Sequence, residues 1–254
     1  MVAANPVRKL ERGERPRVGR REMRILDRDE IGRLLDAADD RHRALLATAT
    51  FTGLRLGELL GLVWADVDFE AGVVRVRKQL AKNGVRVEPK TPQAVRDVVL
   101  MPALARVLKV HREAAFARGF AQPAAPVFAS EAGTPLDRRN VVRRGLERAM
   151  QRAKLDEEGR PRLRFHDLRH TFASLLIAQG ANVGFVSHQL GHANSAITLS
   201  IYEHEFDRVE QAERTRALLE ARFGTVLETA GGDGRRLGAE PNAAEVVALQ
   251  GIRG

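Results

Sequence analysis

The chain has 254 residues, of which 44% are hydrophobic and 30% are charged, and its formal net charge is +9. This length and composition support a substantial buried core, and the surplus of positive charge favours a polyanionic partner such as nucleic acid. The lack of cysteine excludes disulfides and thiolate chemistry, and the lack of long apolar runs or a signal-peptide core predicts a soluble cytoplasmic protein without membrane contacts.

The chain begins with a basic segment that precedes the first predicted helices. Residues 1–24 are rich in arginine, proline and glycine and are typical of an extended arm or linker. Asp27 and Glu30 have the spacing of a capping box, which predicts a helix start. A second helix, over residues 41–52, should end at Gly53, because glycine readily adopts the left-handed backbone that stops a helix.

A short helix and a small sheet are predicted next. The stretch TGLRLGELLGLVW is typical of a short apolar helix, and it carries Arg55 and Glu58. Taken alone, these two side chains would form an ordinary surface ion pair. Within residues 72–102, VVRVRKQL, GVRVEPK and RDVVLMP predict three short antiparallel strands. Lys90 lies at the turn between the second and third strands, where a solvated lysine is the usual finding.

Two helices are expected between the sheet and the C-terminal third. The first runs from Pro102 to about residue 118, and the second, over residues 137–154, is strongly basic and begins with RRNVVRR. Such a face is either solvated or turned toward DNA. We expect the following arginines to face DNA: Arg138, Arg139, Arg143 and Arg144.

Residues 164–204 concentrate the most reactive side chains of the chain. A helix over residues 166–179 would place His166 and Arg169 on one side, away from its apolar stripe. A second short helix would end just before His192, and a third would bring Tyr202, the single tyrosine, to its end.

These elements predict a mainly α fold with a small antiparallel three-stranded β-sheet, an α+β class. We expect one domain over residues 25–226. A charged helix over residues 207–223 would close it, and the Gly- and Ala-rich residues 227–254 would form a disordered tail.

The reactive residues suit attack on a phosphodiester. Arginine is always charged and presents a planar fork of donors, so Arg55 and Arg169 could hold the two non-bridging oxygens. His166 and His192 could complete this clamp or move a proton. The arginines would supply the charge that stabilises the transition state, so neither a metal nor another cofactor is required.

A hydroxyl must serve as the nucleophile. Tyr202 is far more acidic than serine, and nearby cations favour its phenolate further. Lys90 could donate a proton to the departing 5′ oxygen.

The motifs that carry these residues resemble those of the tyrosine recombinases, also called phage integrases, over about residues 24–225. The matching stretches are TGLRLGELLGL, PKTPQAVRDVVLMP, HDLRHTFAS, LGH and SIYEH. The resemblance implies the catalytic-domain fold of that family and site-specific recombination or integration of double-stranded DNA, typical of mobile genetic elements. Such recombinases usually carry a helical DNA-clamping domain before the catalytic one, whereas this chain begins in what resembles the linker.

The resemblance also implies a role for each site residue. Tyr202 would become joined to a DNA 3′ phosphate, with Lys90 as general acid and Glu58 supporting the first arginine. The segment after the tyrosine would dock on a neighbouring protomer, giving a homo-oligomer on DNA. The scissile phosphate would be held by Arg55, Arg169, His166 and His192.

Two other function classes remain open. His166 and His170 have the i,i+4 spacing of helical zinc sites, although Asp167 stands where that motif has glutamate and no clear third ligand follows. The chain could also be a non-catalytic or truncated DNA-binding remnant of an integrase. The absence of the DNA-clamping domain favours this alternative, whereas the filled reactive positions argue against it.

Overall fold

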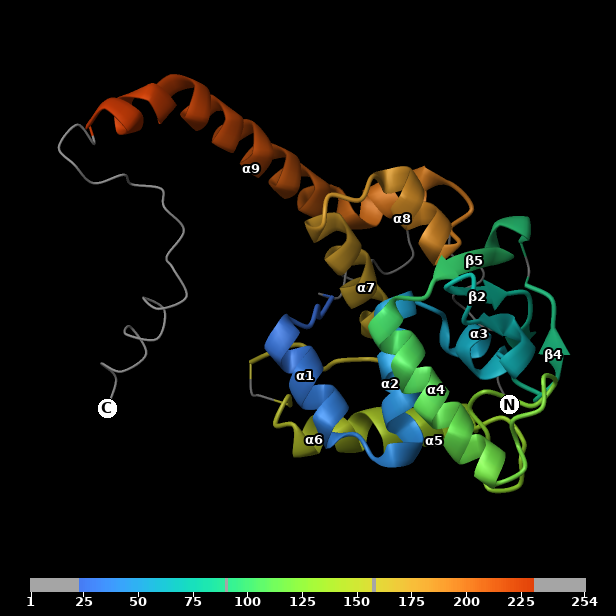
Figure 1. The fold of residues 1–254 in the computed structure, drawn as a ribbon. Helices are drawn as coiled ribbons and strands as arrows, with labels where there is room; N and C mark the ends of the chain where they lie inside the picture. Colours follow the sequence, from blue (N-terminus) through green and yellow to red (C-terminus); the bar gives the residue numbers. More distant parts are fainter. Residues whose placement is uncertain (1–22, 90, 157–158, 231–254) are drawn as a thin grey trace, which may run out of the picture. The chain divides into compact units, whose positions relative to one another are not determined.

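The structure, a computed structural model, describes residues 23–89, 91–156 and 159–230. The chain divides into two compact units, of which the first ends at Ile201 and the second begins at Tyr202. Most elements belong to the first unit (Figure 1). Its longer helices are α1 (Arg28–Ala37), α2 (Asp40–Thr52), α4 (Pro102–Ala117), α7 (Asp167–Ala178) and α8 (Val183–Leu190).

The start of the first helix confirms the predicted capping box. The carboxylate of Asp27 accepts the backbone N–H of Glu30 at 2.8 Å, and the Glu30 side chain accepts the N–H of Asp27 at 3.1 Å. Just before this cap, Arg24 donates to the carbonyl of Leu155, and the N–H of Leu26 donates to Thr171 in α7. The end of the predicted arm is therefore attached to the first unit, while residues 1–22 lie outside the described residues.

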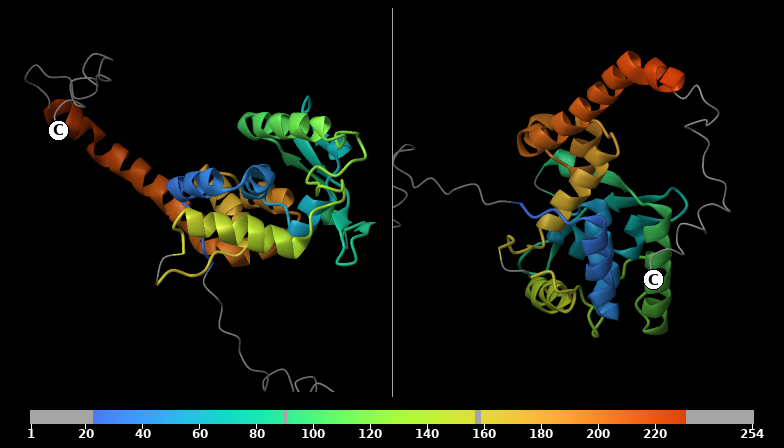
Figure 2. Two further views of the ribbon diagram at one scale, coloured as in Figure 1. Left: turned by 90° about the horizontal axis from the view of Figure 1, so that it is seen from below. Right: turned by 90° about the vertical axis from the view of Figure 1, so that its left-hand side faces the viewer.

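Helix α2 lies between two other helical layers. It contacts α4 on one side and the basic helical segment on the other (Figure 2). Gly145 permits this second contact, because a Cβ there would lie 2.8 Å from the ring of His42 in α2. The basic segment is one continuous helical stretch, as predicted, but its middle is a π-helix. Its parts are α5 (Arg138–Asn140), η4 (Val141–Glu147) and α6 (Arg148–Arg152).

The strands form two small sheets, in agreement with the predicted α+β class but not with the predicted strand pairing. The three-stranded sheet has the order β1-β2-β5, and β3 pairs with β4 in a separate ribbon. The strands are β1 (Val67–Asp68), β2 (Val73–Val76), β3 (Gln79–Leu80), β4 (Arg86–Val87) and β5 (Arg96–Val99). Single 3₁₀ turns precede β1 and β5, as η2 (Trp64–Asp66) and η3 (Pro92–Ala94).

The prediction that β4 belongs to the three-stranded sheet is wrong. The third strand of that sheet is β1. Arg86 explains this difference, because its side chain donates to the carbonyl of Gly61 at 2.7 Å and to Asp66 at 3.0 Å. These contacts hold β4 beside the short helix α3 (Leu56–Gly61). β3 also lies against Gly61, where a Cβ would stand 2.8 Å from the Cα of Gln79.

Helices α7 and α8 end close to the predicted positions, and each is followed by a glycine. Gly180 and Gly191 have φ angles of 78° and 63°, in the left-handed region that favours glycine. The last helix, α9 (Ser195–Ala230), begins in the first unit and continues in the second. The predicted break at Tyr202 is present as a kink, with φ −119° and ψ 16°. The helix continues past the predicted start of the tail at residue 227, and residues 231–254 lie outside the described part of the chain. No helix among the described residues is both long and apolar enough to span a membrane.

Candidate active site: a phosphate clamp

Arg169 lies where three segments of the first unit meet. Helix α7 carries this residue, which is almost fully buried, with 3% exposure. One guanidinium nitrogen donates to the carbonyl of Gly53, at the end of α2, at 2.8 Å. Another donates to the carbonyl of Leu190, at the end of α8. The two glycine-stopped helix ends therefore fix the position of this arginine.

Arg55 reaches the same place from the N-terminus of α3. Its side chain is 39% exposed, and Nη1 donates to Oε1 of Glu58 at 2.8 Å. Its backbone N–H donates to the other carboxylate oxygen at 2.9 Å, while Nη2 approaches the carbonyl of Gly191 at 3.4 Å. The predicted Arg55–Glu58 pair therefore exists, but the carboxylate is buried and the guanidinium is turned toward the turn that precedes His192.

His192 adds a ring to this group of cations. Its Nδ1 lies 2.8 Å from the hydroxyl of Thr198, a fully buried residue in the first turns of α9. Burial, together with the charges of Arg169 and Arg55, lowers the pKa of His192 to about 4. The imidazole is therefore neutral at pH 7. With Nδ1 bonded to Thr198, Nε2 presents a donor or an acceptor according to the tautomer.

His166 and His170 lie next to each other at the start of α7. Their ring centroids are 5.0 Å apart, in an edge-to-face arrangement. Partial burial and the charges of Arg169 and Arg55 lower the pKa of His166, whereas burial and His166 lower that of His170 to about 4. His166 is the exposed member of the pair and His170 the buried one. The charges of Arg55 and Arg169 therefore act on both His166 and His192, and the phosphate-binding role of these four residues stays a prediction.

Two further catalytic residues, Lys90 and Tyr202, were predicted from the sequence. Lys90, the predicted general acid, lies outside the described residues. Tyr202, the predicted nucleophile, is 2% exposed, and the second unit begins at this residue. Their roles stay predictions.

The four arginines expected to face DNA differ from one another. Arg139, Arg143 and Arg144 are exposed on the basic helical segment. Arg138 is half-buried, donates to the carbonyl of Leu80 in β3 and lies against Gly57 of α3. A polar pocket of about 300 Å³ also lies on this segment. Its lining residues are Asn140, Arg143, Arg144, Glu147, Arg148 and Gln151.

Sequence reasoning missed Arg96, a third arginine of the site. It lies in β5, and its side chain is fully buried against Glu58 at 3.0 Å. A signal for it was present in the strand pattern. Residues 96–100 alternate between buried and exposed, so Arg96 shares the core-facing side with Val98 and Leu100. An arginine at a core position needs a buried partner.

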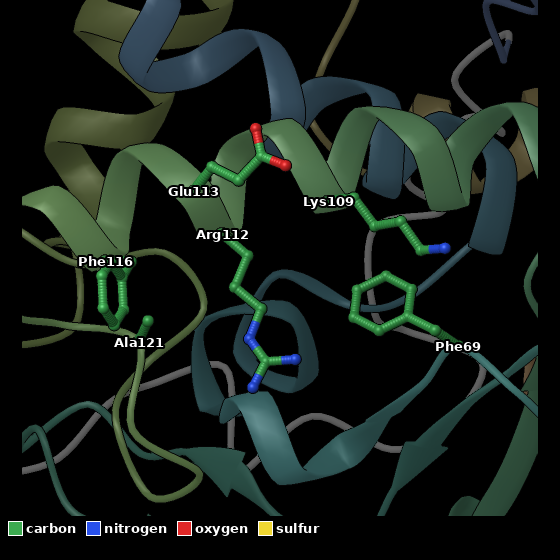
Figure 3. A pocket seen from close by; sticks show the side chains of 6 residues that line it. All are labelled: Phe69, Lys109, Arg112, Glu113, Phe116 and Ala121. Atoms are coloured by element: carbon green, nitrogen blue, oxygen red, sulfur yellow. The ribbon is translucent and has the colours of Figure 1, made fainter.

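Two alternative sites were considered among the described residues, a metal site and a pocket along α4. Within the described ranges, no three His, Cys, Asp or Glu side chains are grouped to hold a metal, so the His166–His170 alternative gains no third ligand. A more open pocket of about 460 Å³ lies along α4 (Figure 3). There Lys109 stands over the ring of Phe69, and no predicted catalytic residue lines it.

Known proteins are similar to this chain in sequence and in fold. The chain matches the phage integrase family over residues 24–208. It is 33% identical over 204 residues to the tyrosine recombinase XerC-like protein of Caldanaerobacter subterraneus subsp. tengcongensis, covering 72% of this chain and 51% of the relative. It is 30% identical over 216 residues to prophage integrase IntR of Escherichia coli, covering 78% of this chain and 51% of the relative. The chain therefore spans about half the length of these two relatives.

Solved structures agree with the sequence match. The crystal structure of XerA recombinase has a TM-score of 0.61 and 26% identity, covering 78% of this chain and 66% of that chain. The Tn1549 transposon integrase in complex with circular intermediate DNA has a TM-score of 0.65 and 26% identity, covering 78% of this chain and 68% of that chain. The grouped arginines and histidines, the α+β fold and these matches agree with one another. The chain therefore belongs to the phage integrase family.

Proposed function

We propose that this chain is the catalytic part of a site-specific recombinase that cleaves and rejoins double-stranded DNA. The observation that carries the proposal is the meeting of Arg55, Arg169 and a neutral His192 at the ends of α2 and α8. Two guanidinium groups and a ring donor match the charge that develops on a phosphodiester under attack. The names of its relatives, recombinases and integrases, support the same activity.

The proposed reaction is a transesterification that conserves phosphodiester bonds. The phenolate oxygen of Tyr202 attacks the scissile phosphorus, and the bond from phosphorus to the 5′ oxygen breaks. Lys90 donates a proton to that oxygen, which leaves as a 5′ hydroxyl, and DNA remains joined to Tyr202 through its 3′ phosphate. A 5′ hydroxyl from another strand then reverses the step, so neither ATP nor a metal takes part.

Trapping of the covalent intermediate tests this proposal. The chain has a single tyrosine. Incubation with supercoiled plasmid in EDTA, followed by denaturation in SDS, should yield nicked DNA with protein on its 3′ ends. Tyr202→Phe should remove the adduct completely. Plasmid binding without any adduct in the unaltered chain would favour the non-catalytic remnant, and cleavage that needs added zinc would favour a metal enzyme.

We also propose that copies of the chain associate on DNA through the helix that follows Tyr202, as the family resemblance implies. Residues 211–222 of α9 are exposed, including Leu218 at 70%. The first unit has an apolar pocket of about 320 Å³ that includes Phe172 and Phe185, and it suits apolar side chains of a neighbouring copy. Light scattering of the DNA complex measures the number of chains bound, and one chain per cleaved duplex would contradict the association.

We further propose that the chain works in the cytoplasm, where its DNA substrate would lie, and that it serves a mobile genetic element.

A further inference from the structure

Arg96 connects three segments of the clamp through one buried guanidinium. Its Nη2 and Nη1 donate to the two carboxylate oxygens of Glu58 at 3.0 and 3.3 Å. Its Nε donates to the carbonyl of Gln189, near the end of α8, at 2.8 Å. Nη1 also donates to the carbonyl of Ala94, just before β5, at 3.0 Å. The side chain therefore joins the sheet to the helix that follows Arg55 and to the turn that precedes His192.

Glu58 lies between the guanidinium groups of Arg55 and Arg96. This arrangement determines how much net positive charge is left to bind the phosphate. Burial opposes the ionisation of Glu58, but Arg96 and Arg55 together hold its pKa below the usual value. The carboxylate is therefore ionised and neutralises one positive charge. Because Arg96 is fully buried, whereas the side chain of Arg55 is 39% exposed, Arg96 is the buried counter-charge and Arg55 faces solvent. Without Arg96, the pair of Arg55 and Glu58 would be neutral and would attract a phosphate weakly.

Arg96 also supports the backbone beside His192. A Cβ at Gly191 would lie 2.8 Å from Nη1 of Arg96, so this turn rests directly on the guanidinium. Gln189 strengthens the same link, because its side-chain oxygen accepts the N–H of Val99 in β5 at 3.0 Å. The place of His192 relative to Arg55 therefore depends on a side chain from the sheet.

We propose that Arg96 is a positioning residue for catalysis, a role that rests on the proposed function. It neutralises Glu58, so that the charge of Arg55 is left for the scissile phosphate, and it holds the turn that carries His192. Arg96 does not touch the DNA in this scheme. Most of its effect passes through the charge of Arg55, and a smaller part passes through the position of His192.

A matched buried ion pair provides the control. Arg24 is 6% exposed, pairs with Glu30 at 3.1 Å and donates to the carbonyl of Leu155 at 2.6 Å. Arg24→Met and Arg96→Met therefore remove similar buried interactions, but Arg24 bonds none of the clamp residues in the described structure. Arg24→Lys and Arg96→Lys are milder versions for use if either methionine variant fails to fold. Melting temperatures of all four show how much stability each change removes.

Cleavage of two synthetic duplexes then distinguishes a positioning role of Arg96 from a general loss of fold stability. Both carry the cleavage site mapped on the plasmid, and one has an uncharged methylphosphonate in place of the scissile phosphate. On the phosphate duplex, Arg96→Met should slow formation of the 3′ adduct by about tenfold or more, while Arg24→Met should not. On the methylphosphonate duplex, the loss from Arg96→Met should shrink to about twofold, because there is no phosphate charge for Arg55 to neutralise.

A double variant gives the second test. Because most of the effect of Arg96 passes through Arg55, Arg55→Ala with Arg96→Met should cleave within about twofold of the rate of Arg55→Ala alone. Equal losses on the two duplexes, or losses that multiply in the double variant, would overturn the role and make Arg96 a structural residue. An unaltered chain that forms no adduct on the phosphate duplex would instead remove the proposed function, and this inference with it.

Discussion

Arg55 and Arg169 would hold the same phosphate, but they are buried to different extents. Arg169 is 3% exposed and donates to the carbonyls of Gly53 and Leu190. The side chain of Arg55 is 39% exposed, and Glu58 keeps Arg96 as a partner if Arg55 is removed. Under the proposed function, Arg169 would therefore contribute to the fold as well as to phosphate binding, whereas Arg55 would contribute mainly to phosphate binding.

Replacement of each arginine by alanine should separate these contributions. Both changes should slow adduct formation by about 10²-fold or more, by analogy with lost oxyanion donors. Arg169→Ala should also lower the free energy of unfolding by about 1–3 kcal/mol for each buried carbonyl left unpaired. Single-turnover cleavage and urea unfolding measure the two effects. An Arg55→Ala variant that loses as much stability as Arg169→Ala would show that Arg55 is structural too.

At the scale of elements, the turn after α8 is built around Gly191. This residue has φ 63°, and its α-hydrogens face Arg96 so closely that a Cβ would lie 2.8 Å from Nη1. Gly180 stops α7 with a similar φ of 78°, but a Cβ there would meet nothing within 4 Å. Both glycines therefore have a left-handed backbone that would strain any other residue. Only Gly191 also lies too close to a neighbouring side chain to accept a Cβ.

Alanine at these two glycines should therefore have unequal effects. Gly180→Ala should destabilise the fold by about 1 kcal/mol, from the left-handed backbone alone, and leave cleavage nearly unchanged. Gly191→Ala should destabilise it further and slow cleavage, because it displaces Arg96 and the turn before His192. Thermal unfolding and adduct formation, measured on both variants, test this. Equal effects at the two positions would mean that Arg96 adapts to the added methyl group.

The elements that sequence predicted well are those with local causes. The capping box of Asp27 and Glu30 and the stops at Gly53, Gly180 and Gly191 depend on residues a few positions apart, so their signals are visible in the sequence. The strand β4 was misplaced because its position depends on Arg86, which bonds residues 25 and 20 positions away. No periodicity within the strand encodes such a contact.

At the scale of the whole molecule, DNA affinity should follow the exposed arginines. Each phosphate contact contributes about −0.9 to the slope of log affinity against log salt concentration. Arg139→Ala, Arg143→Ala and Arg144→Ala should each reduce the steepness of this slope by about 1. Arg138→Ala is the matched control, because Arg138 donates to the carbonyl of Leu80. It should lower the melting temperature and leave the slope unchanged.

Fluorescence anisotropy with a labelled duplex at several salt concentrations measures these slopes. A reduced slope for Arg138→Ala would place that arginine on DNA, as first expected from the sequence. Unchanged slopes for the other three variants would show that the basic segment is a solvated face and that DNA is bound elsewhere.

The sequence by itself determined the family and most helix boundaries. These follow from short motifs, such as HDLRHTFAS and LGH, and from capping residues that act within one or two helical turns. Only the tertiary structure decided which arginines are buried and which residues they contact. Arg169 meets a carbonyl 116 positions away, and Arg96 meets Glu58 at a separation of 38. An arginine is the same residue type in a solvated face and in a buried ion pair, and its role depends on chain segments that folding brings beside it.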